Sequence, residues 1–245
     1  MGRRIRRRCS TNLYLRRRQR SPTQTRAKCV DSPSRHRRQF QEAGFDSVHA
    51  IRPRFEFRAW GDKLDTVRDR IACLADFYEK RESVETYIIS AGTTDANPKV
   101  RGDRLDIKIL IATRDRFEQW EPQLKASFPI PASVLRNDFF RILGQFTPTL
   151  DRDNYSFEQF IHEIVERHDE LAAVEVVKQR RISTLNGCIA EFAHVSIAGE
   201  DIQTAAVEST DLEALHEARR LTGLDEYENI NYPAAIKRAI GWEVP

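Results

Sequence analysis

The chain has 245 residues, a length that suits one sizeable hydrophobic core or two small domains. Its formal net charge of +3 is unevenly divided: residues 1–40 hold 14 Lys and Arg and one acidic residue, which leaves 26 basic and 36 acidic residues, a net −10, in the remainder. No window approaches the roughly 20 apolar residues of a membrane helix, and the four cysteines lack the CxxC spacing of zinc sites. We therefore expect a cytoplasmic protein of a reducing compartment, without a disulfide framework or a membrane segment.

The first segment in chain order is an arginine-rich tail. Residues 1–47 contain few apolar side chains, so ordering them would bury little surface, and the composition predicts disorder. Three hypotheses stay open for this tail: it neutralises phosphates of RNA or DNA, it is an organelle transit peptide, or it lies outside the natural protein. We favour the last, because Met1 is the only methionine and a start at a non-Met codon further on would go unnoticed.

Alternating and helical patterns follow the tail. Residues 53–60 alternate strictly and predict a strand, and apolar residues at helical spacing predict a helix over 64–74. A second strand is expected at 85–90. Residues 99–111 are typical of a hairpin that turns at Gly102-Asp103. We then expect helices over 117–125, 132–143 and 157–167, with a proline-marked break between the first two.

Three strands in meander order are predicted next, over 173–183, 188–197 and 202–209. Asp211 is expected to cap a helix that ends at Gly223, and a last helix is expected over 233–240. Many strands with few parallel crossovers predict an α+β fold, an antiparallel sheet or tunnel-like barrel with helices packed outside. We expect one domain, residues 48–245.

Several predicted strands carry charges on one face and apolar side chains on the other. Arg54, Glu56 and Arg58 share a strand face, as do Arg104, Asp106 and Lys108, and Lys178 with Arg180. Two interpretations stay open: these are solvated outer faces, or they line a polar barrel interior. Arg and Lys bind phosphate oxygens and carboxylates hold divalent metals, so such an interior would suit a polyphosphate.

The order and spacing of these charges resemble the CYTH, or triphosphate tunnel metalloenzyme, superfamily, over most of residues 53–225. That family opens with a Glu-x-Glu-x-Lys strand, and the matching residues here are Arg54-x-Glu56-x-Arg58. Its middle strands carry basic residues, to which Arg101, Lys108 and Lys178-Gln179-Arg180 correspond. A later acid matches Glu191, and the family's Glu-x-Glu matches Ala206-Val207-Glu208.

The resemblance implies roles for these residues. Glu56, Glu191 and Glu208 would hold Mg²⁺ or Mn²⁺; Arg58, Arg101, Lys108, Lys178 and Arg180 would bind the phosphates; and Glu56, Lys178 and Arg180 would be catalytic, with a metal-oriented water as the attacking group. Each acidic pair of the family is halved, however, because Arg54 and Ala206 replace the first Glu of their motifs. Losing two carboxylates would weaken a metal site, since a hard cation prefers oxygen ligands.

Three functional hypotheses result. The first is an enzyme-like domain that binds a triphosphate or similar polyanion, with metal-dependent triphosphate hydrolysis as its reaction. The second is a non-catalytic module of the same fold that binds an anion or a protein. The third is nucleic-acid binding through the tail; for the domain itself nucleic acid is not expected, because its net −10 repels phosphate backbones. Neither the substrate nor the oligomeric state can be read from the sequence.

Overall fold

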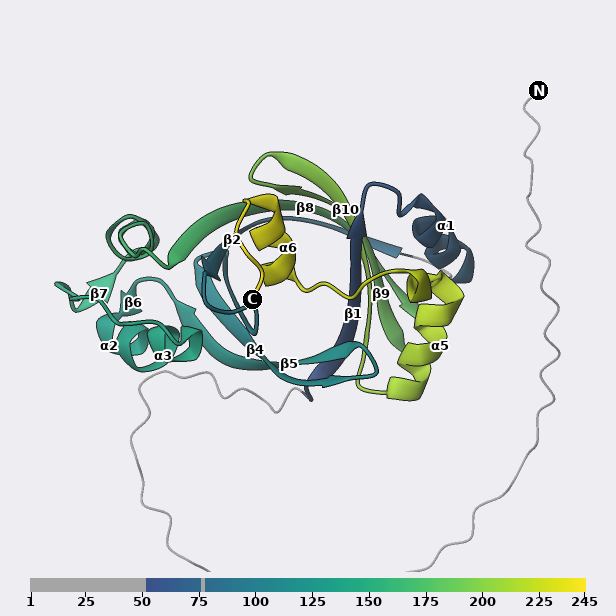
Figure 1. Cartoon of the computed structure of the whole chain (residues 1–245), viewed down its shortest axis with the longest axis horizontal. Coiled ribbons are helices and arrows are strands. Elements are labelled where there is room, and N and C mark those ends of the chain that lie inside the picture. The colour runs from purple at the N-terminus through teal and green to yellow at the C-terminus, as the bar shows by residue number, and fades with distance from the viewer. Residues whose placement is uncertain (1–51, 76–77) are drawn as a thin grey trace, which may run out of the picture. The chain divides into compact units, whose positions relative to one another are not determined.

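Eight antiparallel strands close into a barrel in the computed structural model, which describes residues 52–75 and 78–245. Around the barrel the strands follow the order β1-β10-β9-β8-β2-β3-β4-β5 (Figure 1). They are β1 (Arg54–Gly61), β2 (Tyr78–Ser90), β3 (Ala96–Arg101), β4 (Arg104–Arg114), β5 (Phe117–Ser127), β8 (Leu171–Leu185), β9 (Cys188–Ile197) and β10 (Glu200–Ser209). The predicted fold class, an antiparallel tunnel-like barrel with helices outside, is confirmed.

The first strand closes the barrel, because β1 bonds to two strands that are far from it in the sequence. Phe55 pairs with Ser209 and Gly61 with Gln203 on β10, while Arg54, Glu56 and the residue between them pair with β5. Beyond Glu56 the neighbour on the β5 side changes to residues 229–230: the amide of Arg58 donates to Asn229 Oδ1 at 2.7 Å, and its carbonyl accepts from the amide of Ile230 at 2.8 Å.

Two helices cover the outer face of β1, β9 and β10. These are α1 (Asp65–Leu74) and α5 (Leu212–Thr222), and they pack on the outward side chains of the strands, among them Phe57, Ala205 and Val207. Asp211 caps α5 as predicted, since its Oδ1 accepts from the amides of Glu213 and Ala214. The short η3 (Leu224–Glu226) follows α5.

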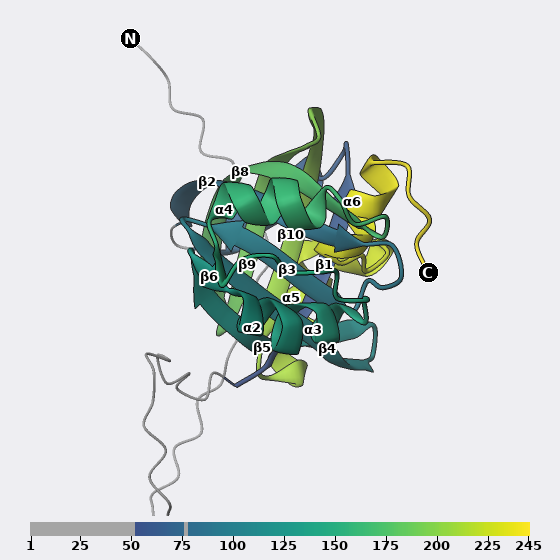
Figure 2. The same cartoon turned by 90° about the vertical axis from the view of Figure 1, so that its left-hand side faces the viewer.

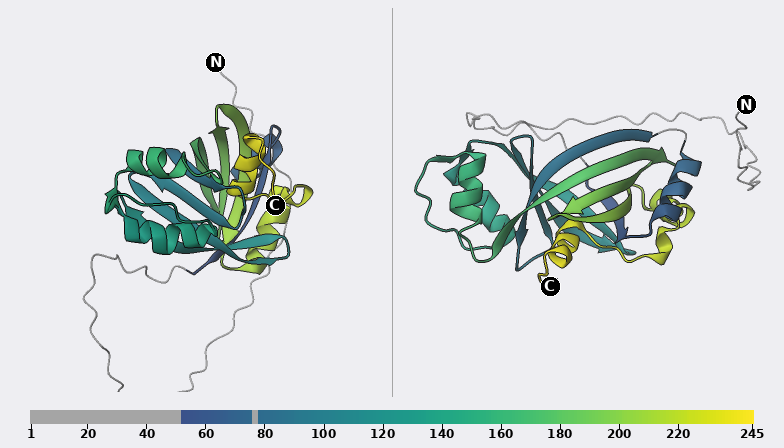
Figure 3. Two further views of the ribbon diagram at one scale, coloured as in Figure 1. Left: turned by 60° about the vertical axis from the view of Figure 1, so that its left-hand side comes forward. Right: turned by 90° about the horizontal axis from the view of Figure 1, so that it is seen from above.

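An insert between β5 and β8 packs on the opposite side of the barrel (Figures 2 and 3). It contains the two-stranded pair β6 (Ile130–Pro131) and β7 (Asn154–Tyr155), with helical segments that each pass through a π-helical turn. Its elements are α2 (Ala132–Val134), η1 (Leu135–Phe139), α3 (Phe140–Leu143), α4 (Phe157–Gln159) and η2 (Phe160–Val165). Aromatic side chains of the insert cover the outward apolar face of β2–β5.

The last helix, α6 (Tyr232–Ala239), lies across one end of the barrel (Figures 1 and 3). Tyr232 and Ile236 pack on Tyr87, Val176 and Val195, which fill the interior at this end. The ammonium of Lys237 is buried and donates to the carbonyl of Ala91 at 2.7 Å, which ties the helix to the barrel rim.

Most of the predicted elements are confirmed, with one clear error. Residues 117–125, predicted to be helical, form strand β5, which pairs with β4 along its length. The strand at 85–90 is longer than expected, since β2 begins at Tyr78. The tail, predicted to be disordered, lies outside the described residues, as does the start of the predicted domain at residue 48. Within the described ranges no helix is long and apolar enough to span a membrane.

Candidate functional site

Charged side chains of the barrel strands face the interior. On β1, Phe57 and Ala59 pack beneath α1 and α5 outside the barrel. Because side chains alternate along a strand, Arg54, Glu56 and Arg58 then point inside. Of the two interpretations of the charged faces, the polar interior is therefore correct for this strand.

Glu85 on β2 is the centre of the first interior cluster. Its side chain is 0% exposed, and its Oε2 lies 2.9 Å from Lys178 Nζ and 3.3 Å from Lys99 Nζ. Its Oε1 lies 3.3 Å from a guanidinium nitrogen of Arg101. Tyr87, two residues along β2, donates to Oε2 at 3.3 Å. One buried carboxylate thus holds three cations from β3 and β8.

Arg58 on β1 is the centre of the second cluster. Its Nε donates to Glu56 Oε1 at 2.7 Å and its Nη1 to Glu191 Oε1 at 3.1 Å. Nη1 also donates to Thr204 Oγ1 at 3.3 Å, and the guanidinium lies over the ring of Tyr232, 4.7 Å from its centroid. The side chain therefore bridges two carboxylates on different strands.

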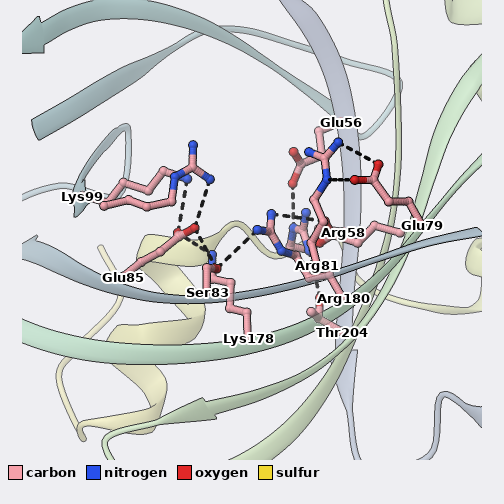
Figure 4. A network of polar contacts seen from close by, with 12 residues as sticks. Glu56, Arg58, Glu79, Arg81, Ser83, Glu85, Lys99, Lys178, Arg180 and Thr204 are labelled. Carbon is pink, nitrogen blue, oxygen red and sulfur yellow. Dashed lines mark hydrogen bonds and ion pairs between the residues drawn. The ribbon is translucent and has the colours of Figure 1, made fainter. Parts of the chain in front are cut away.

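Ser83 and Arg180 join the two clusters into one network (Figure 4). Ser83 Oγ donates to Glu85 Oε1 at 3.2 Å and accepts from Arg180 Nη2 at 3.3 Å. Arg180 Nη1 lies 3.9 Å from Glu191 Oε2, and Glu191 in turn pairs with Arg58. The network thus runs around the interior through β1, β2, β8 and β9.

Burial and neighbouring charges shift the pKa values of this network. Burial raises the pKa of Glu85, but Lys178, Lys99 and Arg101 more than offset it, and the pKa lies well below its usual value. Burial and the charge of Lys99 together outweigh the Glu85 carboxylate at Lys178 and lower the pKa of that ammonium to about 7. Burial likewise lowers the pKa of Lys99. Near neutral pH, Lys178 can therefore exist with or without its proton.

A small cationic pocket lies beside the turn between β3 and β4. Its volume is about 130 Å³, and it is lined by Lys99, Arg101, Arg104, Leu105, Asp106 and Lys125. Four of these six residues carry a positive charge. The pocket is far smaller than the roughly 300–1,000 Å³ of drug-sized ligand sites, so it suits a compact anionic group.

Several buried polar atoms of the interior have no hydrogen-bond partner. In the described part of the chain these are Arg180 Nε, Asp106 Oδ1, Asn97 Oδ1 and Tyr232 OH. Arg180, Asp106 and Asn97 belong to strand faces that line the interior, and Tyr232 caps it from α6. Buried groups without partners are rare in native proteins and indicate an additional bound molecule, such as water or a ligand. The barrel interior can therefore accept a bound molecule beside these atoms.

The carboxylates that the sequence predicts as metal ligands are all paired with arginines. Arg58 holds Glu56 and Glu191, and Arg54 donates to Glu208 at 3.3 Å. Burial raises the pKa of Glu208, and so does Glu56, its partner across β1 and β10. Among residues 52–75 and 78–245, no three His, Cys, Asp or Glu side chains are grouped as in a metal site. This donor set does not fit Mg²⁺ or Mn²⁺, which need several free oxygens.

The structure brings the predicted site residues to one interior, without testing their roles. Those on this interior are Arg58, Glu56, Arg101, Lys108, Lys178, Arg180, Glu191 and Glu208. Sequence reasoning missed Glu85, Lys99 and Tyr232. The alternation of Glu85 with Tyr87 on a predicted strand was a signal for the first of these, whereas nothing in the sequence places Tyr232 at a barrel end.

Comparisons with known proteins return fold-level likenesses only. No family model and no curated protein sequence matches the chain. A conserved hypothetical protein from Pyrococcus furiosus is 14% identical, with a TM-score of 0.42, over 73% of this chain and 98% of that one. A Hippeastrum structure titled a putative adenylyl cyclase with a dominant triphosphatase activity is 14% identical, with a TM-score of 0.43, over 78% and 98%. A putative adenylate cyclase from Bacillus halodurans is 12% identical, with a TM-score of 0.44, over 75% and 95%. Likenesses this low assign neither a family nor an activity to this chain.

Proposed function

We propose that the barrel interior binds a small polyanion, a triphosphate or another polyphosphate. The observation that carries this proposal is the buried Nε of Arg180, a charged donor without a partner in an interior lined by further cations. An oxyanion would satisfy this donor and would be held by charge-assisted bonds from several strands.

The ion pairs of the interior leave capacity for such a ligand. Each lysine ammonium has three donors and each guanidinium five, so contact with Glu85 does not exhaust Lys99, Lys178 or Arg101. Glu85 keeps these cations together and partly compensates their repulsion. A polyanion that binds here adds the negative charge that one carboxylate does not supply.

The pocket beside the β3–β4 turn suits the end of such a ligand. With a volume of about 130 Å³ and four cationic residues, it suits phosphate groups rather than a nucleoside. At the opposite end, apolar side chains and α6 fill the interior. We therefore infer that phosphates enter from the β3–β4 side and that any organic substituent stays outside.

Triphosphate hydrolysis is a second candidate, favoured by Lys178. With a pKa of about 7 this side chain is partly unprotonated at neutral pH, as a general base requires. It would take a proton from the attacking water as the water oxygen bonds to the terminal phosphorus. The bond from that phosphorus to its bridging oxygen breaks, and phosphate and the shortened polyphosphate leave. The catalytic roles of Glu56, Lys178 and Arg180 and the predicted metal dependence remain predictions, and a non-catalytic anion-binding module fits the same interior.

Calorimetric titration with tripolyphosphate tests the proposed binding. Arg180→Gln and Arg101→Gln should each weaken binding by about 10- to 150-fold, the equivalent of about 1.5–3 kcal/mol per charge-assisted contact. Arg220→Gln, which removes an exposed charge from α5 outside the barrel, is the matched control and should leave the affinity unchanged. Equal affinity in all three variants, or no binding by the parent protein, would contradict the proposal.

A phosphate-release assay separates binding from hydrolysis. If Lys178 is the base, kcat/KM, which reports the free protein, should rise through pH 7 as the ammonium loses its proton, and Lys178→Met should abolish phosphate release. Tight tripolyphosphate binding without phosphate release would reject hydrolysis and support the non-catalytic anion-binding module.

A further inference from the structure

Each of the three predicted metal ligands is already paired with a guanidinium group. Glu56 and Glu191 each accept a hydrogen bond from Arg58, at 2.7 Å and 3.1 Å, and Glu208 accepts one from Arg54 at 3.3 Å. Each guanidinium occupies one oxygen of its carboxylate, and its positive charge repels a divalent cation from the other oxygen. The charge that a metal would supply between these carboxylates is supplied here by arginine.

Arg58 is fixed in this position from several sides. It is 6% exposed, donates to Thr204 as well as to both carboxylates, and lies over the ring of Tyr232. A guanidinium keeps its proton throughout the physiological pH range. The guanidinium is therefore a permanent cation whose planar fork matches both carboxylate and phosphate oxygens.

We propose that this barrel takes its polyanion free of divalent metal, with Arg54 and Arg58 supplying the positive charge of a carboxylate-bound cation. This inference rests on the proposed function, since it concerns the same interior. It narrows the ligand class to the uncomplexed polyphosphate, whose oxygens remain available to Arg and Lys. A magnesium complex of the same ligand has fewer free oxygens and would bind less well.

The first experiment measures tripolyphosphate binding by calorimetry at one ionic strength, in excess EDTA and in excess Mg²⁺. We expect an affinity that is the same in EDTA or higher there, because Mg²⁺ occupies oxygens of the ligand. Binding that appears only with Mg²⁺ and is lost in EDTA would overturn the inference while leaving the proposed function intact.

The second experiment needs no polyanion. Mn²⁺ binding to the protein alone, followed by electron paramagnetic resonance, should be undetectable for the parent chain. Arg54→Glu adds a third carboxylate beside Glu56 and Glu208, which face each other across β1 and β10, so it should strengthen Mn²⁺ binding at least about ten-fold. The Arg54 side chain is 45% exposed, and a thermal melt checks that the variant still folds.

Two controls complete the design. Arg54→Met removes the guanidinium without adding a ligand and should gain little Mn²⁺ affinity. Arg136→Glu, an equal charge change on an exposed position of the insert, should gain none. If the parent chain itself binds Mn²⁺ as tightly as Arg54→Glu, the inference is wrong. If tripolyphosphate binds under no condition, the proposed function fails, and the Mn²⁺ titration still decides whether the arginines exclude a metal.

Discussion

Removal of the Glu85 charge is the sharpest perturbation of the interior. Glu85→Gln keeps the shape of the side chain but leaves Lys178, Lys99 and Arg101, now 2.9–3.3 Å from a carboxylate, without their shared counter-ion. Breaking a buried ion pair by neutralising one partner typically costs about 3–5 kcal/mol. Against a total stability of about 5–15 kcal/mol for a domain, the variant should still fold.

The loss is measurable by urea denaturation and by a thermal melt. For a domain of this size, about 3–5 kcal/mol corresponds to a decrease in Tm of roughly 6–20 °C. Glu79→Gln on the same strand is the matched control. Glu79 also pairs with an arginine, Arg81, at 2.8 Å, but both side chains are about half exposed and the pair is screened by solvent, so removing its charge should change the stability far less than Glu85→Gln does.

The same variant should bind polyanions more tightly, because Lys99 and Arg101 lose the carboxylate that competes with the ligand for them. Tripolyphosphate at about 100 times its Kd would return about 2.7 kcal/mol of stability, and less at lower saturation. The increase in stability on adding tripolyphosphate should therefore be larger for Glu85→Gln than for the parent chain or Glu79→Gln. A Glu85→Gln variant as stable as Glu79→Gln, or one that tripolyphosphate stabilises no more than the parent, would refute this account of the interior.

Three further predictions concern stability. The Lys178 ammonium has a pKa of about 7 in the folded chain against 10.5 ordinarily, so between these pH values the unfolded chain binds more protons than the folded chain. The free energy of unfolding, measured by urea denaturation, should therefore rise with pH in this window, by at most about 1.4 kcal/mol per pH unit. The rise should be smaller in Lys178→Met. Asn231 caps α6 through the amide of Ala234 and donates to Glu118, so Asn231→Ala should cost about 1–2 kcal/mol in the same assay; no loss would show that α6 is held without it. Gly223 ends α5 at φ +81°, and Gly223→Ala should lower Tm by an amount equivalent to at least about 1 kcal/mol, because the left-handed region disfavours a Cβ; an unchanged Tm would contradict this.

Strict alternation made much of the barrel predictable. Residues 53–60 alternate strictly and coincide with β1 to within one residue, and the hairpin turn at Gly102-Asp103 lies where expected, with both residues at positive φ. Such patterns follow from local side-chain geometry, so the sequence alone carries them. The side of the barrel to which a charged face points is not local, because it depends on where α1 and α5 pack.

Strand β5 shows why a pattern can mislead. Phe117 and Leu124 are both buried on outward faces and lie seven residues apart, a separation typical of one helix face. In an unbroken strand this odd separation would place them on opposite faces. The pairing with β4 shifts register between Ile107 and Lys108, opposite Leu124 and Pro122, so Gln123 is an extra residue that restores both to the outer face. Such a bulge depends on the partner strand and was not predictable.

The ion pairs of the candidate site could not be predicted from the sequence either. The alternation of the sequence identified Lys178 and Arg180, but Glu85, the counter-ion of Lys178, lies 93 positions away in the chain. Likewise, the ring of Tyr232 reaches Arg58 only because α6 returns to the barrel end. Long-range pairs of this kind are set by the closed topology, which no short motif encodes.

The seam between β1 and β10 affects how the protein folds during synthesis. Arg54 and Glu208, partners across this seam, are 154 positions apart. At about 5–20 residues per second, a ribosome needs roughly 8–30 s to make that stretch. During this interval one edge of β1 has no strand to bond, and the outward Phe57 lacks α5, which is made later still. An unpaired edge with apolar side chains is a template for aggregation. The nascent chain should therefore depend on chaperones until β10 emerges, and slow non-local closure should limit its folding rate.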